Sequence, residues 1–90
     1  TRILFVNFGM DEAMHCLKIV NQLRDDGVGA ELYPDSAKMK KQMAYADAKK
    51  IPYVALIGSE EMKKGEIAIK NMTTGEQSIV SLNELLHILK

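Results

Sequence analysis

Residues 51–58 read Ile51-Pro52-Tyr53-Val54-Ala55-Leu56-Ile57-Gly58, an apolar run that follows a proline and ends at a glycine. Proline disfavours a helical conformation in the residue before it, so a preceding helix must end here. A short apolar run that contains β-branched and aromatic residues predicts a strand, and one without polar alternation is typical of a strand covered on both faces. We therefore expect this segment to be the central strand of a sheet.

The residues before this strand alternate between strand and helix patterns. Residues 3–8 form a second nearly continuous apolar run, and residues 30–33 form a shorter one that ends at Pro34-Asp35. Between these runs, from Asp11 to Gly27, apolar residues follow helical spacing: Ala13, Cys16, Leu17, Val20 and Leu23. A second helix is predicted over residues 36–49, with three residues toward the core: Met39, Met43 and Ala46. Right-handed crossovers would make the three strands parallel.

The residues after the central strand predict a hairpin and a final helix. Residues 59–65 predict one helical turn, and residues 66–70 and 77–80 predict two antiparallel strands joined by a turn. Ser81 and Glu84 have capping-box spacing, and leucines form one face of the helix beyond them: Leu82, Leu85, Leu86 and Leu89. The prediction is one α/β domain over residues 1–90, with three layers, about three helices and a five-stranded mixed sheet of three parallel strands plus an antiparallel hairpin.

Length and composition limit the class of protein. The 90 residues hold 12 Lys+Arg, 12 Asp+Glu and 47% apolar residues, which is typical of one small globular domain without room for a cleft between domains. No apolar run approaches the roughly 20 residues that span a bilayer, and we expect neither a membrane segment nor a signal peptide. The single cysteine indicates a reducing, cytoplasmic compartment. Thr1, directly before a core strand, leads us to expect a domain excised from a larger protein.

Residues that usually carry catalysis are sparse. The segment Phe8-Gly9-Met10-Asp11 lacks the glycine spacing and the lysine of a phosphate-binding loop. Cys16 has no second cysteine for redox chemistry, and its helical position favours packing in the core. His15 and His87 show no zinc-ligand spacing with it. We therefore expect no catalytic residue, no cofactor-binding residue and no metal ligand in this chain.

Charged residues supply the candidates for binding. Residues 1–35 hold 3 basic and 6 acidic side chains, whereas residues 36–90 hold 9 and 6. On the second helix, one strip combines lysines with an aromatic ring: Lys38, Lys41, Tyr45 and Lys49. Such a strip could follow a phosphate backbone and stack a base, although a solvated helix face would carry the same residues. Glu61 lies past the carboxyl end of the central strand, where open sheets bind ligands, and it either accepts from a base or caps the short helix.

Several short motifs span the second half of the chain: Lys40-Lys41-Gln42-Met43, Ala46-Asp47, Ile51-Pro52-Tyr53-Val54, Ile57-Gly58, Glu61, Gly65, Ile69-Lys70 and Thr74-Gly75-Glu76-Gln77. They resemble the C-terminal anticodon-binding domain of class II aminoacyl-tRNA synthetases. The Ile-Pro-Tyr strand, Gly58, Glu61 and Gly65 are shared by the histidyl, threonyl, prolyl and glycyl branches of that family. The lysine pair with Gln42, and the Thr-Gly-Glu-Gln turn, are most similar to the histidyl branch.

The resemblance implies a domain that holds the anticodon loop of its tRNA. A separate catalytic domain of the same chain would attach histidine with ATP and magnesium, and the parent enzyme would be a cytoplasmic homodimer. Glu61 matches an acidic residue that hydrogen-bonds an anticodon base, and Lys70 matches a basic strand residue that faces the loop. Residues at the start of the second helix match a segment that approaches RNA: Lys40, Lys41 and Gln42. Asn71 stands where histidyl relatives often carry Asp, and its role is open.

Three alternatives stay open beside the histidyl branch. The domain could belong to the threonyl, prolyl or glycyl branch, or it could be a stand-alone interaction domain that reuses the fold. A thioredoxin-like or flavodoxin-like domain would share the βαβ start and the Ile51-Pro52 strand, but this chain lacks the cysteine pair and the phosphate loop. Class II catalytic motifs upstream of Thr1 would separate a ligase from a stand-alone domain.

Overall fold

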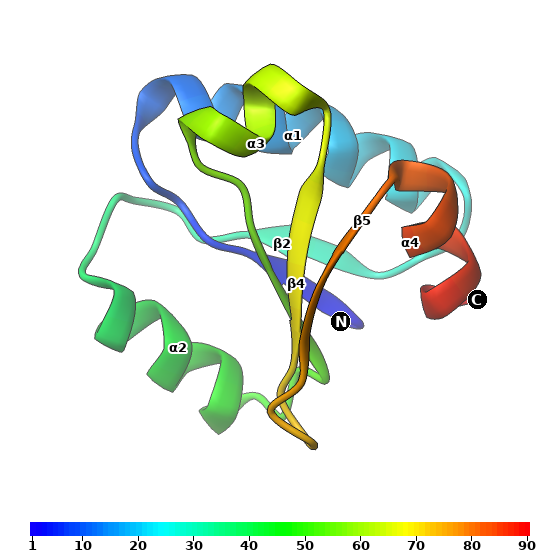
Figure 1. Ribbon diagram of the computed structural model, residues 1–90. Helices are drawn as coiled ribbons and strands as arrows, with labels where there is room; N and C mark the ends of the chain where they lie inside the picture. The colour runs from blue at the N-terminus through cyan, green and yellow to red at the C-terminus, as the bar shows by residue number, and fades with distance from the viewer.

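The computed structural model describes all residues from Thr1 to Lys90 (Figure 1). The elements in chain order are β1 (Ile3–Phe5), α1 (Met10–Asp25), β2 (Ala30–Leu32), α2 (Met39–Ala48), β3 (Tyr53–Leu56), α3 (Ser59–Lys64), β4 (Ile67–Asn71), β5 (Gln77–Val80) and α4 (Leu82–Leu89). The predicted α/β class is confirmed. The helix count differs, because residues 59–64 form a helix rather than a single turn and bring the number of helices to four.

The strands form one mixed sheet in the order β2-β1-β3-β4-β5. Strand β1 pairs in parallel with β2 and with β3, and β4 pairs antiparallel with both β3 and β5. The segment that follows Pro52 is therefore the central strand, as its apolar sequence predicts. The parallel strands β1, β2 and β3 end at the same edge of the sheet, where the loops to α1, α2 and α3 begin.

Two apolar clusters hold the helices on opposite faces of the sheet. The larger cluster joins α1 and α4 to one face, and Ile3, Phe5 and Ala55 are among its strand residues. The smaller cluster joins α2 to the other face through strand residues such as Leu4 and Val54. Figure 1 shows α2 by itself on its side of the molecule. The three predicted layers are therefore present, but the two outer layers differ in size.

One predicted core residue of α1 is exposed. Leu17 is 46% exposed, and Ile19 packs against the larger cluster instead. Successive residues of a helix point about 100° apart, so both neighbours of a core stripe fit the apolar spacing. The rotation of α1 on the sheet selects Ile19 and turns Leu17 toward the edge strand β2.

Helix α2 leaves half of its sheet face uncovered. Five strands about 4.8 Å apart make a sheet roughly 19 Å wide, whereas one helix is only about 10 Å across. Val54 belongs to the cluster beneath α2, so its side chain lies on the α2 side of the sheet. Residues paired directly across neighbouring strands point to the same face, so the register identifies which residues of β4 and β5 also lie on that side. The register places five residues there or at its border: Leu56, Ala68, Lys70, Gln77 and Ile79. We call these five residues the open sheet face.

Cys16 is buried in the larger cluster, as predicted from its position in the helix. Burial raises the pKa of its thiol to about 11, and the nearby negative charge of Glu12 adds to the effect. We expect native protein to resist iodoacetamide at about pH 8, where the reactive thiolate is absent, and unfolded protein to react. Rapid alkylation without unfolding, detected by mass spectrometry, would contradict this burial.

The free energy of unfolding should fall as the pH rises from 9.0 toward 11, because the thiol ionises first in the unfolded chain. A Cys16→Ala variant should lack this part of the pH dependence of the free energy of unfolding.

The final helix begins with the predicted capping box. Ser81 Oγ accepts from the Glu84 backbone N–H at 3.2 Å, and Glu84 Oε1 accepts from the Ser81 N–H at 3.0 Å. A Ser81→Ala variant should lower the free energy of unfolding by about 1 kcal/mol, as loss of a helix N-cap does elsewhere. Denaturant unfolding measures this change. Asn83→Ala, an exposed change on the same helix, should have a smaller effect, and equal effects would show that the cap contributes nothing.

Candidate nucleic-acid interface

Three lysines surround the first turn of α2. Lys38 precedes the helix as its N-cap, Lys40 and Lys41 lie in the first turn, and all three side chains are exposed. The first turn holds no acidic residue, and no side chain caps it. The amino end of a helix carries a partial positive charge, so lysines here oppose the helix dipole. The three lysines therefore do not stabilise the helix. They do favour the binding of an anion such as phosphate, which is attracted by both the lysines and the free N–H groups.

Gln42 is in the core, and its assignment as an RNA-binding residue is wrong. Its side chain is 1% exposed and makes three hydrogen bonds. Gln42 Oε1 accepts from the Asn7 N–H at 2.7 Å, and Gln42 Nε2 donates to the carbonyls of Asn7 at 2.9 Å and Ala37 at 2.8 Å. These bonds connect α2 to the loop between β1 and α1. Gln42 therefore positions the lysines beside it and is not available to RNA.

Tyr45 faces the wrong edge of the sheet for the predicted stacking role. Its ring packs edge-on against Tyr33 with centroids 5.4 Å apart, and its hydroxyl donates to Glu31 Oε1 at 3.0 Å. Glu31 belongs to the edge strand β2, which lies at the opposite side of the sheet from β4 and β5. Lys49 Nζ lies 5.9 Å from the ring centroid, so the predicted mixture of ring and ammonium groups exists locally. The strand that the Tyr45 hydroxyl contacts, β2, is separated from β4, the strand of Lys70, by β1 and β3.

The Tyr45 contact also shifts two pKa values. Hydrogen bonds from Thr1 and Tyr45 lower the pKa of Glu31, because they stabilise its carboxylate against the opposing effect of burial. The bond to Glu31 in turn raises the pKa of Tyr45. The hydrogen bond between Tyr45 and Glu31, which causes both shifts in part, connects α2 to β2. Tyr45 thus has a structural role in this fold.

Lys70 lies on the open sheet face. It pairs with Val54 of β3 and with Gln77 of β5, and its side chain is half-buried. It is the only basic residue in the paired segments of β3, β4 and β5. An ammonium group at a partly desolvated surface interacts more strongly with an anion or a carbonyl than one in bulk water does. Lys70 is a strand residue, as expected, and its contact with an anticodon loop stays a prediction.

Glu61 caps helix α3 and keeps one oxygen free. Glu61 Oε1 accepts from the Gly58 N–H at 2.8 Å, while Oε2 makes no hydrogen bond within the chain. Glu61 therefore caps α3, which was one of the two roles expected for it. It does not remove the binding alternative, because a carboxylate has a second acceptor oxygen. Gly58 lies just beyond β3, so Glu61 is at the carboxyl edge of the central strand.

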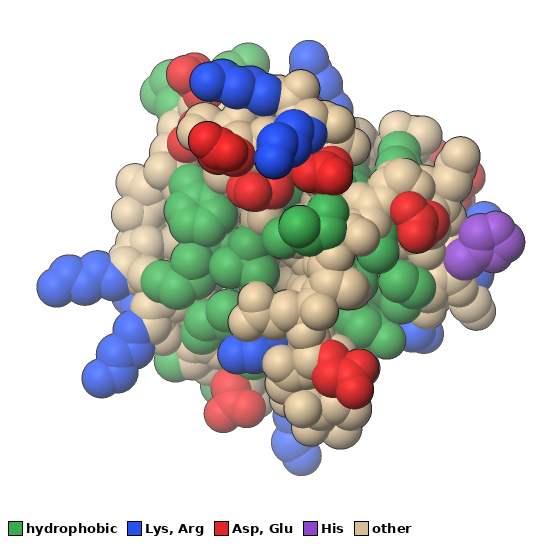
Figure 2. Space-filling view, viewed as in Figure 1, with side chains coloured by type: hydrophobic (Ala, Val, Ile, Leu, Met, Phe, Trp, Pro, Cys, Tyr) green, Lys and Arg blue, Asp and Glu red, His purple; other side chains and the backbone are tan.

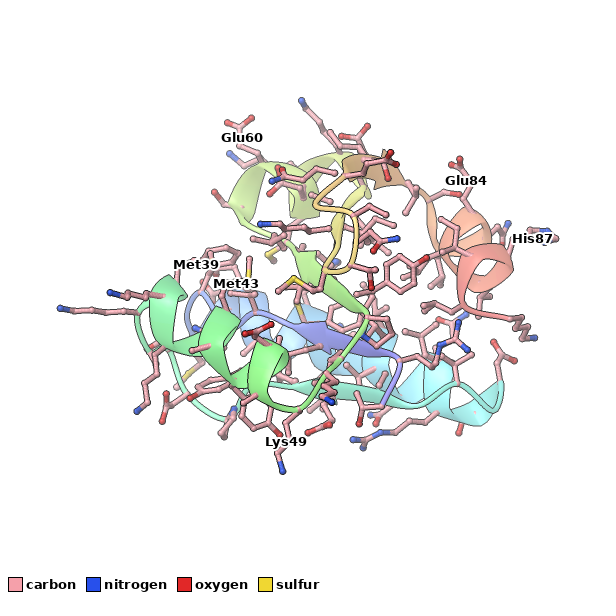
Figure 3. All side chains as sticks on the ribbon, turned by 90° about the horizontal axis from the view of Figure 1, so that it is seen from below. Met39, Met43, Lys49, Glu60, Glu84 and His87 are labelled. Atoms are coloured by element: carbon pink, nitrogen blue, oxygen red, sulfur yellow. The ribbon has the colours of Figure 1, made fainter.

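Apolar side chains lie beside these charges, and the sequence pattern did not indicate that they would be accessible. Met39, Met43 and Leu56 are half-buried at the border of the smaller cluster, and Ile79 is exposed. Figure 2 shows apolar side chains gathered in the middle of the face between α2 and α3. In Figure 3, Met39 and Met43 lie along one side of α2, away from Lys49. The sequence indicated the two methionines as core residues, and only the uncovered sheet leaves them partly accessible.

The predicted binding residues thus divide into two groups. One group lies on the α2 side of the sheet or at its carboxyl edge: Lys40, Lys41, Lys70 and Glu61. The other group does not lie there, because Gln42 is buried and Tyr45 faces β2. No group of three or more His, Cys, Asp or Glu side chains is arranged to hold a metal ion. No helix has the length and apolar character needed to cross a membrane.

Comparisons with known proteins identify relatives that match nearly the whole of this chain. A histidine–tRNA ligase of Phocaeicola vulgatus is 57% identical over 90 residues, which cover 100% of this chain and 20% of that protein. A solved histidyl-tRNA synthetase from Staphylococcus aureus has a TM-score of 0.86 at 31% identity and is matched over 97% of this chain and 22% of its own. A Nostoc histidyl-tRNA synthetase gives 0.91 at 26% identity over 98% of this chain and 21% of its own.

This chain spans about a fifth of the length of these relatives. The relatives favour the histidyl branch over the threonyl, prolyl and glycyl branches. A family described as "Anticodon binding domain" matches residues 2–90, which excludes the thioredoxin-like alternative. The chain belongs to the anticodon-binding domain family and is similar to the domain of that kind in histidine–tRNA ligases.

Proposed function

We propose that this domain binds the anticodon loop of a tRNA as part of a histidine–tRNA ligase. The observation that carries the proposal is the open sheet face, which leaves Lys70 accessible on the same side of the sheet as α2, the helix that carries Lys40 and Lys41 in its first turn. Bases of an RNA loop are unstacked and present their hydrogen-bonding edges and flat faces. A surface with lysines at its border and apolar side chains within it suits such bases, since charges bind the phosphates and apolar groups pack on the bases.

The division of roles follows from the placement of the charges. Lys40 and Lys41, with the free N–H groups of α2, would bind phosphates and set the register of the loop. Lys70 would donate to a base carbonyl or to a phosphate, and Glu61 Oε2 would accept from a base amino or imino group. Along β3, Val54 beside Lys70 and Gly58 beside Glu61 are four residues apart, or about 13 Å at a rise near 3.3 Å per residue. The two side chains would therefore contact different nucleotides.

The rest of the reaction is assigned to residues outside this chain. The parent ligase would attach histidine to its tRNA with ATP and magnesium, as a cytoplasmic homodimer. We expect no ATP or magnesium site within these 90 residues, because the sequence lacks a phosphate-binding glycine loop and ligand spacing for a metal ion. This domain would supply affinity and selectivity for the tRNA, and the catalytic domain would supply the chemistry.

A Glu61→Gln variant tests the proposal in the full-length ligase. Glutamine keeps an acceptor for the Gly58 N–H, so α3 stays capped, but it can present an amide donor where the free carboxylate oxygen was. We expect the preference for the histidine anticodon over substituted anticodons to fall by about 10-fold or more, since one base contact contributes about 1–3 kcal/mol of discrimination. Binding titrations of tRNA transcripts at one fixed salt concentration measure this preference.

Glu60→Gln is the matched control. Glu60 is the neighbouring carboxylate on α3, it is exposed, and it makes no hydrogen bond within the chain. The control should keep the anticodon preference of the parent protein. Equal affinity of the unmodified ligase for every anticodon would defeat the proposed recognition, whatever the variants do.

A further inference from the structure

Lys70 and Gln77 lie side by side on the open sheet face, where they are paired directly across β4 and β5. The next pair toward the turn is joined by a backbone hydrogen bond of 2.8 Å, from the Asn71 N–H to the Glu76 carbonyl. Hydrogen-bonded and non-hydrogen-bonded pairs alternate in an antiparallel ladder, so Lys70 and Gln77 form a non-hydrogen-bonded pair with Cα atoms about 4.5 Å apart. This is the closer of the two pair geometries, so both side chains can reach one small chemical group.

Neither side chain is occupied by a partner within the chain. The side-chain hydrogen bonds of this hairpin lie in its turn, where Asn71 Oδ1 and Thr74 Oγ1 accept from backbone N–H groups. Lys70 is half-buried and Gln77 is exposed. A lysine offers donors only, whereas a carboxamide offers an acceptor oxygen and a donor group. The two residues therefore present free donors beside a free acceptor.

An apolar surface lies next to this pair. Ala68 is directly paired with Leu56 of β3 and with Ile79 of β5, and all three belong to the open sheet face. Leu56 is half-buried, and Ile79 is 61% exposed. Because Ala68 carries only a methyl group, a flat ring can approach the sheet closely there. Residues two apart on a strand are about 7 Å apart, so a ring packed on this surface would bring its edge to Lys70 and Gln77.

A nucleobase fits this arrangement better than a phosphate does. A phosphate diester only accepts hydrogen bonds, so it would leave the Gln77 oxygen unpaired and would lose water against Leu56 and Ile79. The edge of an unstacked base carries donors and acceptors side by side, and its faces pack on apolar side chains. With Lys70 donating to one acceptor of the base, Gln77 meets the groups beside that acceptor. These groups differ between bases, so Gln77 can distinguish one base from another.

We infer that Lys70 and Gln77 read a single nucleotide of the anticodon loop, and that Gln77 is the specificity-determining residue of the pair. The inference rests on the proposed function, which brings an RNA loop to the open sheet face. Lys70 supplies affinity, because its donors suit an acceptor on any base. Glu61 is bonded to Gly58, about 13 Å along β3 from the partner of Lys70, so it contacts a different nucleotide.

Anticodon substitution tests the inference in the full-length ligase. Transcripts that differ at single anticodon nucleotides are titrated at one fixed salt concentration against the unmodified ligase and a Gln77→Leu variant. Loss of the carboxamide should reduce the discrimination by about 10-fold or more at one nucleotide and leave the others unchanged. Ser78→Ala is the matched control, because Ser78 is also exposed on β5 but points to the other face of the sheet. It should keep the discrimination at every nucleotide.

A double-substitution cycle tests whether the two residues share a nucleotide. The losses of tRNA affinity in Lys70→Ala and Gln77→Leu should not add, and the double variant should bind at least about 3-fold more tightly than the product of the two losses predicts. The losses in Glu61→Gln and Gln77→Leu should add to within about 2-fold, because those residues contact different nucleotides.

Two results would overturn the inference without affecting anticodon recognition itself. One is unchanged discrimination in Gln77→Leu, and the other is additive losses in Lys70→Ala and Gln77→Leu. Equal affinity of the unmodified ligase for every anticodon would instead defeat the proposed function, and this inference with it.

Discussion

A Gln42→Ala variant is expected to lose about 3 kcal/mol or more of the free energy of unfolding, since each buried polar group left without a partner costs about 1–3 kcal/mol. The substitution removes the partner of three backbone groups: the N–H and the carbonyl of Asn7, and the carbonyl of Ala37. It also leaves a cavity, because the Gln42 side chain is fully buried. Small domains are stable by about 5–15 kcal/mol, so the loss should be visible in any denaturant titration.

Two further variants separate the loss of hydrogen bonds from the loss of side-chain volume and from the effect of an exposed substitution nearby. Gln42→Met nearly keeps the side-chain volume and removes the hydrogen bonds, and it should retain most of the destabilisation. Lys41→Ala, an exposed change at the adjacent position, should alter the free energy of unfolding by less than about 0.5 kcal/mol. If Gln42→Ala unfolded at the same denaturant concentration as Lys41→Ala, the buried network would not exist in solution. That result would also restore Gln42 as a candidate RNA contact.

The Gln42 network connects stability to function. Asn7 Nδ2 donates to the Tyr33 carbonyl at 3.0 Å, and Asn7 Oδ1 accepts from the Gly9 N–H at 3.0 Å. Together with Gln42, Asn7 joins the loops that follow β1 and β2 to the first turn of α2. The network therefore holds Lys40 and Lys41 at the carboxyl edge of the parallel strands. A rigid support of this kind reduces the cost of ordering the lysines when they bind an anion.

A Lys70→Ala variant of the full-length ligase is expected to bind tRNA at least about 10-fold more weakly, since a hydrogen bond from a charged group contributes about 1.5–3 kcal/mol. Lys70 is half-buried on the open sheet face, with Val54 on one side and Gln77 on the other. Its ammonium group is thus held near any base that packs against the sheet. Filter binding or fluorescence titration at fixed salt measures the change.

Lys90→Ala is the control for loss of one positive charge. Lys90 follows α4, which packs on the other face of the sheet, and its side chain is exposed. A general electrostatic effect would weaken binding equally in both variants, whereas the proposed site predicts little change for Lys90→Ala. Lys70→Arg should recover part of the affinity, because it keeps the charge and adds donors. Equal affinities of Lys70→Ala and Lys90→Ala would place the tRNA elsewhere on the domain.

Local sequence patterns predicted most of the elements and the central position of the strand after Pro52. The apolar run after Pro52 indicated the strand that pairs on both sides, and Ser81 with Glu84 indicated the start of α4. Both signals arise from residues close in sequence, whose hydrogen bonds and packing change little with the surrounding fold. The family motifs likewise indicated Lys70 and Glu61 as contacts of the anticodon loop; the structure shows Lys70 on β4 and Glu61 as the cap of α3, and their contacts with RNA stay predictions.

Only the tertiary structure decided which side chains of the helices reach solvent. Helical spacing defines an apolar face but not the rotation of the helix on the sheet, so Leu17 and Ile19 fit the pattern equally well. The family resemblance, which matched the start of α2 as a whole, placed Gln42 among the RNA-binding residues, although Gln42 is buried against Asn7. A glutamine is polar in any sequence pattern, and its burial depends on partners 35 residues away.

The sequence by itself therefore determined the α/β class, the elements and the family, because each depends on local patterns or shared motifs. The tertiary structure decided that α2 covers part of its sheet face, and that Lys70 and the neighbouring apolar side chains remain accessible. The reason is the width of a five-stranded sheet, about 19 Å, against a single helix about 10 Å across. That uncovered surface results from the packing of whole elements, which no single segment of the chain encodes.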